Sequence, residues 1–74
     1  MDITLRVRAF KGFDMNIFDV YALTDEGKWV RFTDHSVKVF KKELTYPEYK
    51  AASDEVKALV EKDFARTHNI KWVN

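Results

Sequence analysis

The stretch Val20–Phe32, VYALTDEGKWVRF, predicts the central hairpin of the fold. Its middle residues, Thr24–Lys28, have the form of a three-residue hairpin loop, in which Gly27 adopts the positive φ angle that closes a type I turn. Counting outward from this turn fixes the partners on two antiparallel strands, because side chains alternate between the faces of a sheet. The expected pairs are Leu23–Trp29, Ala22–Val30, Tyr21–Arg31, Val20–Phe32 and Asp19–Thr33. Ala22–Val30 and Val20–Phe32 are apolar pairs, and they define one face of the sheet.

The residues after Phe32 predict a second hairpin. Thr33–Ser36 has the composition of a four-residue loop between two strands. The expected pairs across it are Phe32–Val37, Arg31–Lys38, Val30–Val39 and Trp29–Phe40. Both turns therefore predict the same apolar face.

The N-terminal residues continue this alternation. One face of the first strand carries Ile3, Leu5 and Val7, and the other carries Thr4, Arg6 and Arg8. Lys11–Gly12 offers a tight turn into the second strand. At Asn16–Phe18 two large apolar residues are adjacent, which predicts a bulge near the start of that strand.

After the sheet the apolar period changes from two to about 3.6 residues, which predicts one amphipathic helix. Its apolar side is formed by Tyr49, Ala52, Val56, Leu59, Val60 and Phe64. Thr45–Glu48 has the pattern of a capping box with a proline in the first turn, and Asn69 is the expected left-handed C-cap. Ile70–Val73 then predicts a short last strand or an extended tail along one edge, with Trp72 packed.

Together these elements predict an α+β fold, in which a four-stranded antiparallel meander sheet is packed on one face by a single C-terminal amphipathic helix, with a short terminal strand. A chain of 74 residues that is 46% hydrophobic and 34% charged is typical of one small globular domain, residues 1–74. The absence of cysteine excludes disulfides and zinc–cysteine sites. No apolar run predicts a membrane span or a signal peptide, so we expect a cytoplasmic protein without a membrane partner.

The sheet face that the helix leaves open is the predicted binding site. Helix packing on the valine face is favoured, because the opposite arrangement would bury several unpaired cations. The predicted site residues are Arg6, Arg8, Tyr21, Leu23, Trp29, Arg31, Lys38, Phe40 and Lys42. Their cations face a single carboxylate, Asp19, although the formal net charge of the chain is only +1.

A surface that is both basic and aromatic is compatible with three kinds of binding. Trp, Tyr and Arg are the residues that most often contribute interface energy, so we expect a small binding or regulatory protein, such as an inhibitor, adaptor or accessory factor, that acts on a protein partner. The same face could instead join two copies in a homodimer. The alternative is sequence-tolerant binding of single-stranded nucleic acid, with bases stacked on the rings and phosphates held by the cations.

Enzymatic activity is the least favoured class. His35 and His68 lie in a predicted loop and at a helix end, and neither has a serine or cysteine beside it in a nucleophile pattern. Gly12 and Gly27 are each explained by a hairpin turn, so no phosphate-binding loop is predicted. We therefore expect a non-enzymatic protein with no cofactor and no bound metal.

Overall fold

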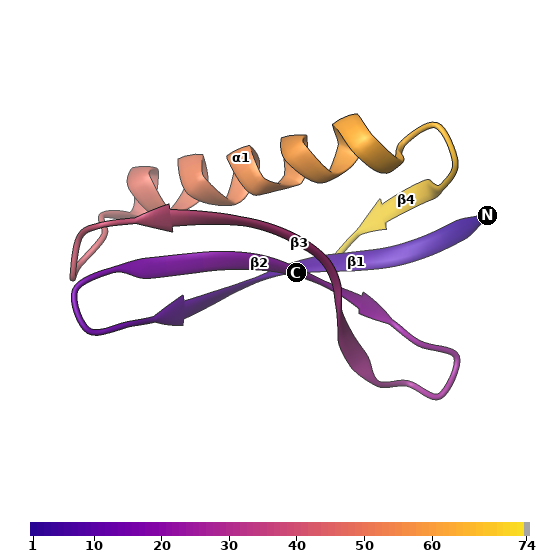
Figure 1. Ribbon diagram of the computed structural model, residues 1–74, viewed down its shortest axis with the longest axis horizontal. Helices are drawn as coiled ribbons and strands as arrows, with labels where there is room; N and C mark the ends of the chain where they lie inside the picture. The colour runs from indigo at the N-terminus through magenta and orange to yellow at the C-terminus, as the bar shows by residue number, and fades with distance from the viewer. Residues whose placement is uncertain (74) are drawn as a thin grey trace.

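The structure, a computed structural model, describes residues 1–73 and has a small α+β fold (Figure 1). A four-stranded mixed sheet, with strand order β3-β2-β1-β4, is packed against one helix. Its elements are β1 (Asp2–Lys11), β2 (Asn16–Leu23), β3 (Trp29–Val39), α1 (Tyr46–Phe64) and β4 (Asn69–Trp72). The helix covers one face of the sheet and leaves the other open.

The hairpin between β2 and β3 forms as its sequence predicts. The backbone N–H of Thr24 donates to the carbonyl oxygen of Lys28 at 2.8 Å, and Gly27 has a φ angle of 82°. A glycine is favoured there because a side chain at positive φ is strained. The pairs Leu23–Trp29, Ala22–Val30 and Tyr21–Arg31 are confirmed.

The predicted second hairpin is wrong, because β3 runs without reversal through Thr33–Ser36 to Val39. Asp19 pairs with Ser36, so residues 32–35 all lie opposite the single residue Val20 and form a wide bulge. The register shift makes the expected pair Asp19–Thr33 wrong, and Phe32 lies opposite Val20 only as part of the bulge. The continuous strand makes four further expected pairs wrong: Phe32–Val37, Arg31–Lys38, Val30–Val39 and Trp29–Phe40. The bulge expected at Asn16–Phe18 is also wrong, because the pairing of those residues with β3 is regular.

Contacts with the helix explain why the chain bulges at this point. The ring centroid of Phe32 lies 4.8 Å from that of Phe64 at the end of α1. His35 Nε2 lies within hydrogen-bonding distance of the carboxylate of Asp63, also on α1. The extra residues of β3 thus reach the helix instead of turning back toward β2.

The sheet is mixed rather than a purely antiparallel meander. β1 pairs with β2 and β2 with β3 in antiparallel fashion, whereas β4 pairs with β1 in parallel. β3 and β4 therefore run in the same direction, and a chain that joins two such strands needs a long crossover. The 19 residues of α1, about 28 Å of helix at 1.5 Å per residue, provide it.

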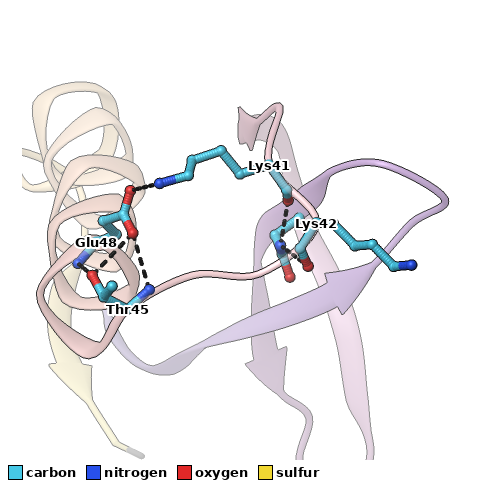
Figure 2. Close-up of polar contacts among 5 residues, drawn as sticks. Lys41, Lys42, Thr45 and Glu48 are labelled. Atoms are coloured by element: carbon cyan, nitrogen blue, oxygen red, sulfur yellow. Dashed lines mark hydrogen bonds and ion pairs between the residues drawn. The ribbon is translucent and has the colours of Figure 1, made fainter.

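The helix begins where its capping box predicts. The hydroxyl of Thr45 accepts from the backbone N–H of Glu48, and the Glu48 carboxylate accepts from the backbone N–H of Thr45 at 3.0 Å (Figure 2). Lys41 also reaches the Glu48 carboxylate. The bonds from Lys41 and then Thr45 lower the pKa of Glu48 from 4.5 to about 2.

The helix ends earlier than its C-cap signal suggests. Phe64 is its last residue, and Ala65 caps it in a right-handed helical conformation. Asn69 is not a left-handed cap, because among residues 1–73 only Gly27 has a positive φ angle. It is instead the first residue of β4 and pairs with Asp2.

The core lies between α1 and the helix-facing side of the sheet. Its buried apolar side chains are Leu5, Phe18, Val20, Ala22 and Val37 from the strands and Ala52, Val56 and Val60 from the helix. Tyr49 and Leu59, expected on the apolar side of the helix, remain 45% and 38% exposed. No helix within residues 1–73 is both long and apolar enough to cross a membrane.

Candidate binding face

The open face is formed by the side chains that alternate with the core residues of β1, β2 and the start of β3. The register places Arg6 beside Tyr21, Arg8 beside Asp19 and Phe10 beside Ile17. We use "open face" for Arg6, Arg8, Phe10, Ile17, Asp19, Tyr21, Leu23, Trp29 and Arg31. These residues belong to three adjacent strands, so the sheet sets their spacing.

Arginine side chains on the open face lie over aromatic rings. The guanidinium carbon of Arg6 is 4.5 Å from the ring centroid of Trp29. That of Arg8 is 4.8 Å from the ring of Phe10 and 5.0 Å from the ring of Tyr21. Because cations within about 6 Å of a ring centroid are attracted to it, each guanidinium is restrained by the sheet beneath it.

A carboxylate lies within this basic surface. Asp19 is only 7% exposed and is the one buried charged residue among residues 1–73. Arg31 Nη2 donates to Asp19 Oδ1 at 3.5 Å, and Arg31 Nε donates to the carbonyl oxygen of Thr33 at 3.0 Å. Arg31 is therefore largely engaged within the protein, and the open face retains a positive balance from Arg6 and Arg8.

Arg6 is held by stacking rather than by a hydrogen bond at Nε. Within residues 1–73, the buried Nε of Arg6 has no hydrogen-bond acceptor. An unsatisfied buried donor costs about 1–3 kcal/mol, so the contact with Trp29 has to offset this loss. The position of Arg6 consequently depends on the indole ring.

This arrangement favours the binding of carboxylate or phosphate oxygens over the stacking of nucleobases. A guanidinium stacked on a ring still has N–H groups at its edge, and their planar arrangement matches the two oxygens of a carboxylate or phosphate. The ring faces that a nucleobase would need are partly occupied by arginine. Leu23, which is 39% exposed, adds an apolar contact beside Trp29.

The structure places three predicted site residues away from Trp29. Lys38 pairs with Ile17 and so lies on the open side of the sheet, at the end of the open face, about 20 Å along β2 from the Leu23–Trp29 pair. Phe40 follows the end of β3 and is 72% exposed. Lys42 lies in the loop before α1 and points away from Glu48 (Figure 2). The expected approach of Phe40 to Trp29 is wrong, because it relied on the second hairpin.

Phe10 belongs to the open face but was not among the predicted site residues. Phe10 has the same parity as Arg6 and Arg8 on β1 and lies 6.2 Å, centroid to centroid, from Tyr21. The alternation of the first strand was a signal for it, but the register between β1 and β2 was needed to place it beside Tyr21. The open face therefore has Phe10, and not Phe40, as its third aromatic ring.

The two histidines lie elsewhere, near the end of α1. His35 contacts Asp63, and His68 Nδ1 lies 2.8 Å from the hydroxyl oxygen of Thr67. Their rings pack edge-on against Phe64. Within residues 1–73, no three His, Cys, Asp or Glu side chains converge as a metal site would require.

Comparison with protein-family models, curated proteins and solved structures gave no match for this chain.

Proposed function

We propose that this chain is a small non-enzymatic binding protein, an inhibitor, adaptor or accessory factor, whose open face docks onto an acidic surface of a protein partner. The observation that carries the proposal is the stacking of Arg6 on Trp29 and of Arg8 between Phe10 and Tyr21. Restrained arginines lose less conformational entropy on binding than free ones, which favours affinity.

The composition of the face supports a protein partner. Tyr, Trp and Arg are enriched among residues that dominate interface energy, and here they form one cluster flanked by the partly exposed Leu23. The positive balance from Arg6 and Arg8 would steer an acidic surface toward the face. The partner would therefore combine carboxylates with an apolar contact.

Single-stranded nucleic acid is the second candidate, since phosphates also accept from guanidinium groups. Arg6, Arg8 and Arg31 with Tyr21 and Trp29 supply both charge and rings. It ranks second because stacking of a base would have to displace an arginine from the ring that it covers.

The test compares two probes on isotope-labelled protein by NMR titration, a peptide rich in Glu and Leu and a poly(dT) oligonucleotide. We expect the peptide to shift the Arg6, Arg8 and Trp29 resonances, with binding that weakens as salt rises. Arg8→Lys keeps the charge but loses the planar group, and it should weaken peptide binding about tenfold.

Arg66→Lys is the matched control, because Arg66 is exposed beyond the end of α1. It should leave peptide binding unchanged. The role of the open face would be refuted if the peptide shifted only resonances of other surfaces. It would also be refuted if Arg8→Lys bound the peptide as tightly as the wild type does. Tighter binding of poly(dT) than of the peptide would favour the nucleic-acid alternative.

A further inference from the structure

Half of β1 has an unpaired edge. β4 pairs only with Asp2–Leu5, whereas β1 continues to Lys11 (Figure 1). The carbonyl oxygen of Leu5 accepts from the N–H of Val73, so alternation turns the N–H and C=O groups of Val7, Ala9 and Lys11 toward the same side. Within residues 1–73 no strand pairs with that half of the edge.

This edge lacks the bulge that protects the other edge of the sheet. On β3, a wide bulge at residues 32–35 bends the strand and Lys38 is exposed beside it. Bulges and edge lysines both discourage pairing with another chain. From Leu5 to Lys11, β1 pairs regularly with β2 and contains neither a bulge nor a proline, and its one lysine, Lys11, donates to the Glu43 carboxylate at 2.7 Å.

We propose that the free edge of β1 pairs with the same edge of a second copy, in antiparallel fashion about a twofold axis at Ala9. In this register Ala9 lies opposite Ala9 of the second copy, and Val7 lies opposite Lys11. All of these residues direct their backbone groups outward, so up to about six hydrogen bonds form across the axis. An isologous contact of this kind closes after two copies.

Side-chain pairing favours this register over the neighbouring one toward the N-terminus. It places Arg8 of one copy opposite Phe10 of the other, and the small Ala9 lies at the axis. A shift by two residues toward the N-terminus would instead place the two Arg8 side chains opposite each other, which is unfavourable. The Arg8–Phe10 pairing repeats between copies a contact that already exists within each copy.

The proposed contact also accounts for an exposed aromatic residue. Phe13, in the turn between β1 and β2, is 95% exposed. Because Lys11 lies opposite Val7, this turn approaches the end of β4 in the second copy. A hollow of ≈ 230 Å³ lies there, lined by Val7, Tyr49, Ser53, Lys57 and Val73. Phe13 would cover it, removing about 150–250 Å² from water per ring.

Pairing at Ala9 would merge two sheets into one and place both open faces on the same side, since opposite residues of an antiparallel pair share a face. The two Arg8 and Phe10 clusters would then lie side by side. The dimer itself does not depend on the proposed function, because its formation is measured without any partner.

Sedimentation equilibrium over a range of concentrations tests the proposal. We expect a concentration-dependent dimer for the wild type. Ala9→Pro removes an outward N–H without disturbing the ladder with β2, and it should be monomeric at concentrations where the wild type is dimeric. Lys38→Pro is the matched control on the β3 edge, and it should remain dimeric. NMR spectra confirm that both variants are folded.

Two further variants keep the test decisive if Ala9→Pro fails to fold. Phe13→Ser should weaken the dimer about 10–100-fold. Ala9→Cys should form an intermolecular disulfide under mild oxidation, because the chain has no other cysteine and Cα atoms of such a pair are about 5.5 Å apart. Lys38→Cys should not cross-link at a comparable rate.

A wild type that stays monomeric at every concentration would overturn the proposal. So would a dimer that survives Ala9→Pro, or equal cross-linking at positions 9 and 38. If the monomer instead bound an extended peptide along β1, the occupant of the edge would be another protein and not a second copy.

Discussion

Arg6 and Trp29 should show an energetic coupling of about 1 kcal/mol in a double-mutant cycle. The guanidinium carbon lies 4.5 Å from the ring centroid, and both side chains are partly buried. Exposed cation–π pairs contribute about 0.5–1 kcal/mol and desolvated ones about 2, so a partly buried pair falls between these limits. The variants are Arg6→Met, Trp29→Leu and the combination of both.

The single variants should differ in their total effect. Arg6→Met loses the stacking but also removes the buried Nε that has no acceptor within residues 1–73, so its net destabilisation should be below the coupling energy. Trp29→Leu keeps an apolar side chain but leaves Arg6 without the ring that holds it. This variant should lose more stability than Arg6→Met.

Urea unfolding followed by circular dichroism measures the four free energies of unfolding. A change of 1 kcal/mol corresponds to about 4–8 °C in Tm for a chain of this size, so thermal melts give an independent check. A cycle between Trp29 on β3 and Arg66, an exposed residue beyond the end of α1, should be additive within about 0.3–0.5 kcal/mol. A coupling of Arg6 with Trp29 no larger than this would refute the view that the ring fixes the guanidinium.

Three further predictions concern stability. Phe18→Ala should destabilise the fold by about 3–5 kcal/mol in urea unfolding, because Phe18 is fully buried and packs edge-on against Tyr49 at 5.1 Å; a loss below about 1 kcal/mol would contradict this. Gly27→Ala should lose about 1–2 kcal/mol through its φ of 82° alone, since no atom lies within 4 Å of an added Cβ, and Gly27→Asn should lose less. The folded-state pKa of Glu48 is lowered to about 2 by Lys41 and the helix cap, so the stabilisation from the Glu48 carboxylate is present above pH 4.5 and is lost as the pH falls toward 2. Glu48→Gln should therefore reduce the fall in the free energy of unfolding with decreasing pH, measured by urea unfolding. An unchanged pH dependence would refute this role of Glu48.

Local signals predicted the elements that depend on neighbouring residues. The capping box of Thr45–Glu48 determined where the helix begins, because its hydrogen bonds join residues three apart. The loop Thr24–Lys28 determined a hairpin and its three nearest strand pairs through the positive φ of Gly27. The alternation of β1 correctly separated core residues such as Leu5 from Arg6 and Arg8.

The segment Thr33–Ser36 shows where local signals stop being sufficient. Its polar residues fit a hairpin loop, and they also fit a bulge within one strand. Packing of Phe32 on Phe64 and the contact of His35 with Asp63 selected the bulge. Both contacts join residues far apart in the sequence, so the composition of the segment did not reveal them.

The sequence by itself determined which side of its strand each residue faces, and thus that Arg6, Arg8, Tyr21 and Trp29 share a face. Only the tertiary structure decided how that face is arranged: the continuous β3 strand placed Lys38 beside Ile17 and kept Lys38 and Phe40 away from Trp29, and the β1–β2 register added Phe10. It also placed β4 parallel to the first half of β1 and left the second half unpaired. The physical reason is that side-chain alternation repeats every two residues along one strand, whereas register and strand order depend on packing between distant segments.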